Sequence, residues 1–305
     1  MEAIKTEALG KIYRKGVRQR QVEAVRDLNL TVADGEIFGF LGPNGAGKST
    51  TIKILCDLIR PTNGRAAILG QDVRYPEARR QIGYLPENPS YYGFLTGWEL
   101  IGFHGTMHGM GQPSIRDRGK ELLEMLDLAD AAHRPLRTYS KGMVQRLGIA
   151  AALIHDPRIL ILDEPMSGLD PVGRKLVADL MLELRDRGKV MFFSTHILHD
   201  IEVICDRIGI ITHGELRFSG TLADMISESF SSYEVVLRRV EPEQVEALAQ
   251  RGFVAITFED KVKVEVPKGD IAAFLATHMQ QDMELIAIEP KRLTLEDFFM
   301  GFVNG

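Results

Sequence analysis

The stretch that decides the fold is Ile37-Phe-Gly-Phe-Leu-Gly-Pro-Asn-Gly-Ala-Gly-Lys-Ser-Thr50. Its first five residues form a short apolar run before a glycine, which is typical of a buried strand that leads into a turn. The segment from Lys48 to Ile59 has the pattern of a helix, and Arg60-Pro-Thr-Asn-Gly64 stops it. The stretch therefore predicts a strand, a glycine-rich loop and a helix in direct succession.

The loop in this stretch matches G-x-x-x-x-G-K-[ST], the phosphate-loop motif. Its glycines let the backbone turn tightly, so that successive N–H groups and the helix N-terminus form a seat for a polyanionic phosphate. We expect Lys48 to neutralise the β- and γ-phosphate oxygens and Ser49 to offer a hydroxyl ligand to Mg²⁺. A chance glycine-rich turn would lack the strand and helix on either side. The predicted ATP contacts in this loop are Gly42, Pro43, Asn44, Gly45, Ala46, Gly47, Lys48, Ser49 and Thr50.

A second apolar run, Ile159-Leu-Ile-Leu162, ends in two carboxylates, Asp163 and Glu164. Strand ends of a parallel sheet point at the ligand crevice, so both acids are expected there. We expect Asp163 to hold Mg²⁺ and Glu164 to orient and deprotonate the attacking water. Two acids after a strand are, taken alone, more often a solvated turn. The phosphate loop in the same chain favours the catalytic interpretation.

The order of strand-like and helical runs predicts two domains. Strands alternate with helices over residues 1–226, which indicates an α/β domain of the P-loop NTPase class with a mostly parallel sheet. Helical spacing dominates from about 96 to 155, so a helical subdomain is expected there. A polar linker at 227–232 leads to residues 233–305. Their order β-α-β-β-α-β predicts a small α+β domain of the ferredoxin-like kind.

The bulk composition excludes some classes of function. The chain has 305 residues, 45% of them hydrophobic, and a formal net charge of −5, so no general attraction to nucleic acid is expected. Its two cysteines, Cys56 and Cys205, lack partners at metal-ligand spacing and are expected to be reduced. The most apolar stretch, Leu147–Ile154, is shorter than the roughly 20 residues that a membrane-spanning helix needs. Any membrane role therefore requires a partner chain.

With these motifs in place, residues 1 to about 225 resemble the nucleotide-binding subunit of ABC transporters. The feature specific to that family is a signature sequence, usually L-S-G-G-Q, which here is Tyr139-Ser-Lys-Gly-Met-Val-Gln-Arg146. Ser140 and Gly142 are kept, and they supply a hydroxyl and unobstructed N–H groups at a helix start. Alone, these residues would be an ordinary helix cap. The resemblance implies that the signature of one subunit closes on the ATP of another, in a homodimer or a pair with a paralogous ABC subunit.

The resemblance also assigns four further positions. Tyr13 sits where the family places an aromatic ring against adenine, although a surface tyrosine is an equally good interpretation of the residue alone. Asp170 matches the loop that crosses between the two sites, and His196 matches the switch histidine at the γ-phosphate. Glu87 replaces the usual glutamine near Mg²⁺, so hydrolysis is expected to be slower or more dependent on the partner. The predicted catalytic residues are thus Lys48, Glu164 and His196, and the predicted metal ligands are Ser49, Glu87 and Asp163.

Within the family the chain resembles ATPases of bacterial ABC-2-type exporters. The resemblance rests on the variant signature Tyr139–Met143, the turn Tyr84-Leu-Pro-Glu87 and the ending Leu295-Glu-Asp-Phe-Phe299. It implies outward transport of a lipid, polysaccharide, drug or similar substrate through a separate transmembrane permease, with this chain at the cytoplasmic face of the inner or plasma membrane. Some aromatic residues of the segment 88–105 are expected to receive a short helix of that permease, and others to be core. These residues are Tyr91, Tyr92, Phe94, Trp98 and Phe103.

Two other functions stay open on the sequence. The first is a soluble ABC ATPase in DNA repair or translation, although such proteins usually carry a long coiled coil or two cassettes, and this chain has neither. The second is a module that senses ATP without turnover. The intact set of Lys48, Asp163, Glu164 and His196 argues against that second possibility.

Overall fold

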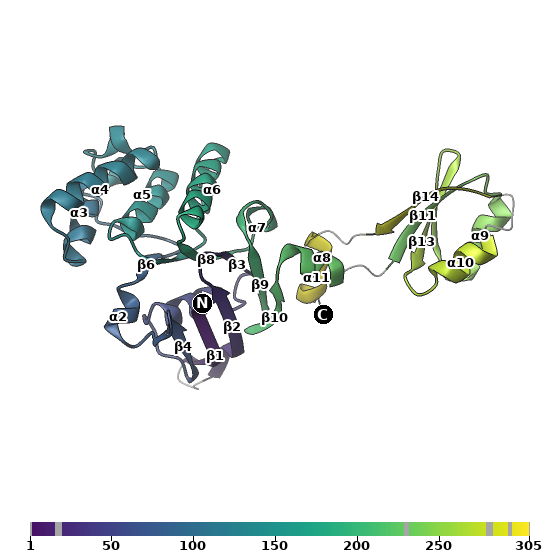
Figure 1. The fold of residues 1–305 in the computed structure, drawn as a ribbon, viewed down its shortest axis with the longest axis horizontal. Coiled ribbons are helices and arrows are strands. Elements are labelled where there is room, and N and C mark those ends of the chain that lie inside the picture. The colour runs from purple at the N-terminus through teal and green to yellow at the C-terminus, as the bar shows by residue number, and fades with distance from the viewer. Residues whose placement is uncertain (1, 16–19, 229–231, 279–282, 292–294, 305) are drawn as a thin grey trace. The chain divides into compact units, whose positions relative to one another are not determined.

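The structure is a computed structural model and describes residues 2–15, 20–228, 232–278, 283–291 and 295–304. The chain divides into two compact units, Met1–Thr221 and Leu222–Gly305 (Figure 1). The first unit ends before position 226, because helix α8 (Leu222–Glu228) groups with the second unit. Of the linker expected at 227–232, residues 229–231 lie outside the described residues, whereas 227 and 228 belong to α8 and Ser232 begins β11.

The first unit is built around a sheet of six strands in the order β10-β9-β3-β8-β7-β6. The strands from β9 to β6 are parallel, and β10 is antiparallel to β9. The central strands are fully buried apolar runs, as a parallel sheet with two covered faces requires. The bounds are β3 Ile37–Leu41, β6 Ile82–Leu85, β7 Ile159–Asp163, β8 Val190–Thr195, β9 Arg207–Thr212 and β10 Glu215–Gly220.

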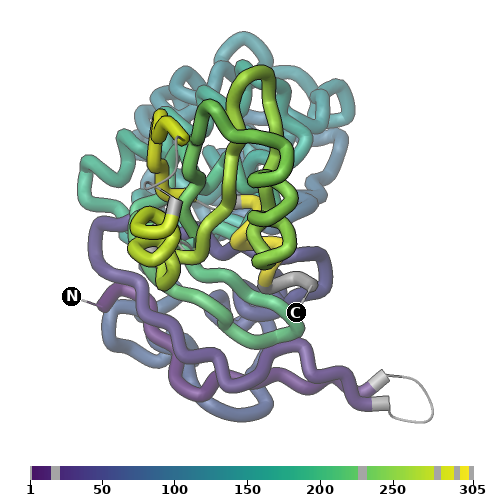
Figure 2. The backbone as a smooth tube through the Cα atoms, turned by 90° about the vertical axis from the view of Figure 1, so that its right-hand side faces the viewer, coloured from purple at the N-terminus to yellow at the C-terminus, as the bar shows by residue number. Residues whose placement is uncertain are grey.

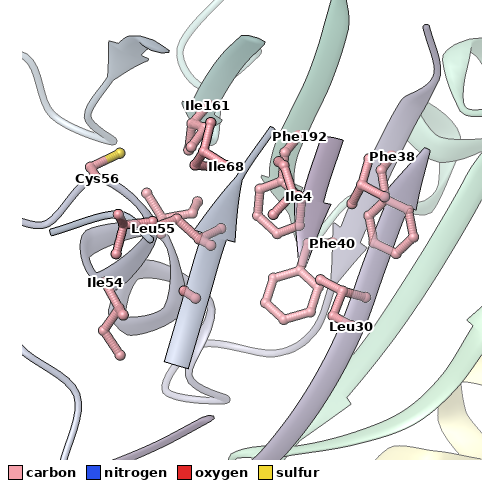
Figure 3. Close-up of a cluster of buried hydrophobic side chains, with 14 of the residues drawn as sticks. Ile4, Leu30, Phe38, Phe40, Ile54, Leu55, Cys56, Ile68, Ile161 and Phe192 are labelled. Atoms are coloured by element: carbon pink, nitrogen blue, oxygen red, sulfur yellow. The ribbon is translucent and has the colours of Figure 1, made fainter. Parts of the chain in front are cut away.

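A second, antiparallel sheet in the order β2-β1-β4-β5 shares its core with the first. Figure 2 shows β1 and β2 as one long hairpin. In the shared core, the ring of Phe192 lies 5.8 Å from that of Phe38 and 5.3 Å from that of Phe40, between centroids (Figure 3). Ile4 and Leu30 bring the antiparallel sheet into the same cluster. The bounds are β1 Glu2–Lys15, β2 Arg20–Ala33, β4 Asn63–Ile68 and β5 Gln71–Asp72.

The helices of the first unit include a separate helical group, α3 to α5, as the sequence predicts. The side chain of Thr96 accepts a hydrogen bond from the backbone of Glu99, whose carboxylate accepts one in return, and this capping box starts α3. Within the described residues, no helix is both long enough and apolar enough to span a bilayer. The bounds are α1 Lys48–Leu55, α2 Pro76–Arg79, α3 Gly97–Met107, α4 Gln112–Met125, α5 Lys141–Leu153, α6 Pro171–Asp186 and α7 Leu198–Ile204, with short 3₁₀ turns at Ala129–Ala131 and Leu136–Thr138.

Helix α1 is shorter than its sequence predicts. The expectation placed its end at Ile59, but the helix ends at Leu55. Asp57 has a φ of 56°, in the left-handed region, and a residue in that conformation ends a helix. Aspartate is one of the few residues that adopt it at modest cost, so the stop precedes the Pro61 that marks it in the sequence.

The second unit contains the order β-α-β-β-α-β, and its antiparallel sheet has the order β12-β13-β11-β14. This is the ferredoxin-like arrangement that the sequence predicts. Its helices pack on the sheet face that carries Val235 and Val264, and Phe274 of α10 belongs to the same buried cluster. The bounds are β11 Ser232–Arg238, α9 Pro242–Gln250, β12 Val254–Phe258, β13 Lys261–Pro267, α10 Ile271–His278 and β14 Glu284–Lys291, followed by α11 Leu295–Asn304.

Replacing Phe192 with alanine should lower the free energy of unfolding of the first unit by about 3–5 kcal/mol, because it leaves a cavity in the shared core. The single tryptophan, Trp98, lies on α3, so its fluorescence during urea unfolding reports on this unit. The matched control is Leu58→Ala, at a residue that is 57% exposed, and its cost should stay within about 0.5 kcal/mol. Equal losses in the two variants would contradict this account of the core.

Candidate functional site

The loop between β3 and α1 depends on its glycines. Gly47 has a φ of 113°, and a Cβ added there would lie 2.4 Å from the carbonyl oxygen of Ala24. A Cβ on Gly42 would lie 2.4 Å from the carbonyl oxygen of Ile211. Neither position has room for a side chain, so only glycine allows the loop to wrap tightly at the start of the helix. Because Gly47 also precedes α1 without a side-chain cap, the first N–H groups of that helix remain for a ligand.

This loop surrounds a cavity of about 280 Å³. The walls come from the loop, from the start of α1 and from three residues elsewhere in the chain. The lining residues are Ala24, Pro43, Asn44, Gly45, Gly47, Lys48, Ser49, Thr50, Glu87 and Glu164. A larger cavity of about 650 Å³ lies between α6 and α7, but no residue of the phosphate loop lines it. Glycine-rich backbone, one lysine and a helix start make the smaller cavity the one suited to a polyanion.

The ammonium of Lys48 is buried at this cavity. Its Nζ donates to the carbonyl oxygen of Gly42 at 2.5 Å and lies 3.6 Å from the carboxylate of Glu164. Burial lowers the pKa of Lys48, whereas the charges of Glu164, Asp163 and Glu87 oppose that shift. A bound polyphosphate would stabilise the charged ammonium further, so the site gains most from an anionic ligand.

Strands β7 and β8 place the two acids and the histidine together. Asp163 is the register partner of Ser194, whose Oγ donates to Asp163 Oδ1 at 2.5 Å and accepts from the backbone N–H of Glu164 at 3.0 Å. The Oε2 atom of Glu164 lies 2.9 Å from Nδ1 of His196. One carboxylate is therefore held between the ammonium of Lys48 and an imidazole.

The backbone at Glu164 is strained. Its φ of 51° is in the left-handed region, where a glutamate rarely sits. Strain of this kind persists where the surrounding structure fixes it, and it is concentrated at functional sites. The strained residue, Glu164, directly follows the end of β7, and its carboxylate lines the cavity.

Two buried residues that support the acids escaped the sequence analysis, Ser194 and Gln145. The Nε2 atom of Gln145, on α5, donates to the carbonyl oxygens of Glu164 at 3.1 Å and Pro165 at 3.2 Å. It thereby ties the signature helix to the acidic turn. The available signal in the sequence was a glutamine two residues before the apolar run Leu147–Ile154, because an amide buried beside such a run needs hydrogen-bond partners.

The structure does not bring every predicted site residue to the cavity. Ser140 caps α5 by accepting from the N–H of Met143 at 3.2 Å, and Asp170 caps α6 by accepting from that of Gly173 at 2.9 Å. Gly142 packs against the loop just before α6. Tyr13 lies on β1, with the ammonium of Lys11 at 5.3 Å from its ring centre. The predicted residues outside the lining are Tyr13, Gly42, Ala46, Ser140, Gly142, Asp163, Asp170 and His196.

The sequence and the fold are similar to those of known ATP-binding proteins. The family described as ABC transporter matches residues 25–167. An ABC transporter ATP-binding protein of Synechocystis, sll0415, is 41% identical, over 97% of this chain and 83% of its own length. The daunorubicin/doxorubicin resistance ATP-binding protein DrrA of Streptomyces peucetius is 40% identical, over 82% and 74% respectively. Among solved structures, the dimeric ATP-binding cassette MJ0796 bound to ADP and Pi is 27% identical, covers 72% of this chain and 98% of its own, and has a TM-score of 0.67.

Replacing Ser194 with alanine removes the donor to the buried Asp163 carboxylate, so the free energy of unfolding should fall by about 1–3 kcal/mol. Urea unfolding followed by Trp98 fluorescence measures this loss. Ser114→Ala is the control, because that serine is exposed on α4. If both alanine variants unfold at the same urea concentration, Ser194 does not support the acidic turn.

Proposed function

The chain belongs to the family of ABC transporter ATP-binding proteins, and from that premise we propose how it works. It binds MgATP with the loop Gly42–Thr50, hydrolyses it with Glu164 as general base and powers a separate transmembrane subunit. The observation that carries the proposal is the position of the Glu164 carboxylate. It lines the phosphate-binding cavity and is held between Lys48 and His196.

The proposed binding mode assigns a role to each part of the cavity. The backbone N–H groups of the loop and of the start of α1 face the phosphates, and Lys48 Nζ exchanges the carbonyl of Gly42 for phosphate oxygens. Tyr13, partly exposed on β1, faces the adenine. ATP binding thus replaces weak contacts of a buried ammonium with charge-assisted ones.

The residues present fit Mg²⁺ as a companion of ATP. Among the described residues, no group of three or more His, Cys, Asp or Glu forms a cage for a metal ion. Mg²⁺ does not need one, because it is usually held by one or two carboxylates, substrate phosphates and water. The hydroxyl of Ser49 and the carboxylates of Asp163 and Glu87 supply oxygen donors of that kind. Bound there, the ion neutralises phosphate charge.

In the proposed reaction, Glu164 accepts a proton from the attacking water at one of its carboxylate oxygens. His196 Nδ1, 2.9 Å from Oε2, fixes the orientation of that carboxylate. Gln145 and Ser194 hold the backbone of Glu164 from two sides, so the strained turn keeps its shape through the cycle.

We further propose that two ABC subunits complete each other's sites, either two copies of this chain or this chain and a paralogue. Ser140, Gly142 and Asp170 do not line the cavity of their own chain, and they sit at helix starts that suit a phosphate of another subunit. The dimeric state of the similar cassette MJ0796 supports this arrangement.

The proposed contact with a transmembrane permease lies on exposed aromatic residues of the segment 88–105. Tyr92 is 71% exposed and Phe94 is 69% exposed, and their rings stack with centroids 5.5 Å apart. Trp98 instead packs beside Gly119 and His133, which gives it a structural role. Such a contact would hold the chain at the cytoplasmic face of the membrane, and the drug-resistance relative supports outward transport.

The relatives named above give no support to a role in DNA repair or translation.

The variant Glu164→Gln should lose ATP hydrolysis by about 100-fold or more, because the amide cannot accept the proton of water. It should still bind ATP, since the loop and Lys48 are unchanged. Phosphate release and nucleotide binding by the purified variant measure the two effects. Glu87→Gln, at a second carboxylate of the same cavity, is the matched control and should remain active. Full activity in Glu164→Gln would show that another group is the base.

Alanine at both Tyr92 and Phe94 should weaken assembly with the permease by about tenfold or more, because buried aromatic anchors carry much of the binding energy of interfaces. Co-purification with the transmembrane subunit measures assembly, and ATP binding should not change. Tyr75→Ala, at an aromatic residue 60% exposed elsewhere on the unit, is the control. Unchanged assembly of the double variant places the permease contact on another surface.

A further inference from the structure

Strand β12 is a free edge of the sheet in the second unit, and one of its sides is apolar. Val254, Ile256 and Phe258 alternate along it and are 57%, 61% and 61% exposed. The intervening Ala255 and Thr257 point to the face that carries the helices, because they pair with the buried Val264 and Val262. The strand contains no charged residue, no proline and no glycine. An exposed edge of this kind readily pairs with another strand.

The rest of the open face does not continue this apolar row. Its central strands carry ion pairs, Lys263 with Glu234 and Arg238 with Asp260. Those ion pairs are partly exposed to solvent, so a partner that covered the whole face would have to remove water from their charges. Among the described residues of the second unit, the large apolar side chains that are more than half exposed all lie on β12, whereas Ile286 and Ile288 of β14 are 40% and 37% exposed. This distribution points to a contact along the edge of β12.

Strand β14, at the opposite edge of the same sheet, carries features that prevent it from pairing with a strand of another molecule. Strand β14 has a register shift opposite Val236 and Leu237, contains Pro290, and carries Glu284 and Glu289. A bulge, a proline and charges each prevent a strand edge from pairing. Strand β12 pairs with β13 in an unbroken register and has none of these features.

We propose that β12 pairs antiparallel with β12 of a second copy of this chain, with the twofold axis at Ile256. The inference rests on the proposed function in one respect, that two copies work together. In an antiparallel pair of identical strands related by a twofold axis, opposed side chains must point to the same face of the sheet. This condition is met only when the axis passes beside a residue that pairs with its own copy, and not between two residues. The axis at Ile256 sets Val254 opposite Phe258 twice and Ile256 opposite its own copy, so each apolar side chain of this edge packs beside an apolar side chain of the partner.

Charge also fits this pairing. The strand is preceded by Arg251, which is exposed at the end of α9, and followed by the exposed turn Glu259-Asp260. An antiparallel pair brings the beginning of each strand to the end of the other. The basic end of one copy therefore approaches the acidic turn of its partner, whereas a parallel pair would align like charges.

The contact between the two β12 strands is small, so it requires a second interaction that holds the two copies together. Five residues per strand bury much less than the roughly 1,000 Å² of a stable independent interface. Two copies held together by their first units would, however, meet at an effective concentration in the millimolar range. The pairing is therefore expected to be weak between free chains and to form readily in the closed ATP-bound pair.

Disulfide trapping in the full chain tests the register. Ile256→Cys should form a covalent dimer, because paired residues have Cα atoms about 4.5–5.5 Å apart, within the range for a disulfide. Val254→Cys is the matched control. It is equally exposed on the same side, but its own counterpart lies roughly 13 Å along the partner strand. It should cross-link at least about tenfold more slowly, yet chains with Val254→Cys should cross-link to chains with Phe258→Cys.

The native thiols do not interfere with this experiment. Burial raises the pKa of both the Cys56 and the Cys205 thiol, which leaves them unreactive towards mild oxidants. Non-reducing electrophoresis of each variant, without nucleotide and with MgATP in the Glu164→Gln background, gives the rates. Equal cross-linking at positions 254 and 256, or none at either under both conditions, overturns the proposal.

The same experiment separates this inference from the proposed function. Preference for position 256 supports the strand pairing whether or not ATP changes the rate. If MgATP does not accelerate the cross-link, the ATP-driven pairing of first units fails while the edge contact stands. A second variant, Ile256→Asp, should lower the cross-linking of a Val254→Cys and Phe258→Cys mixture about tenfold, because it places like charges opposite each other at the axis.

Discussion

The chemistry of this chain depends on three parallel strands that end at one edge of a sheet. Leu41 of β3 is the register partner of Thr195 of β8, and Ser194 of β8 is that of Asp163 of β7. Those registers place the carboxylate of Glu164 3.6 Å from Lys48 Nζ of the phosphate loop and 2.9 Å from Nδ1 of His196. A shift of any strand by one residue would turn its side chains to the other face and separate the groups.

The same arrangement explains why the site is suited to a polyanion. A buried ammonium and a buried carboxylate, Lys48 and Glu164, lie 3.6 Å apart with little solvent around them. Burial penalises both charges, and the carbonyl of Gly42 satisfies the ammonium only in part. In the proposed mechanism, a triphosphate supplies the negative charge that balances Lys48, and Glu164 becomes free to act on water. Binding and catalysis thus draw on one incompletely balanced pair.

Much of the fold could be predicted, because local pattern and motif agree with the tertiary structure. Strand Ile37–Leu41 has the bounds that the sequence predicts, and the apolar run Ile159–Leu162 forms β7, which extends by one residue to Asp163. The strand order of the second unit also follows from its element order. The sequence could not show that Asp57 would stop α1 early, since that depends on one backbone angle.

The site was predictable where a residue's role is set by its own motif. Lys48 and Glu164 belong to this class, and the structure places both at one cavity. Gln145 and Ser194 were missed because their importance comes from partners across the fold, at separations that periodicity does not encode. The open edge of β12 was missed for the same reason, because only the sheet order shows that no strand in the described part of the chain pairs with its outer side.

The most direct test of the central claim is calorimetric titration of the purified chain with MgATP, beside its Lys48→Ala variant. The account predicts saturable binding of one nucleotide per chain, and a loss of that binding in the variant while Trp98 fluorescence reports an intact first unit. A purified, folded chain that binds no adenine nucleotide, or a variant that binds it as tightly as the parent, would contradict the account.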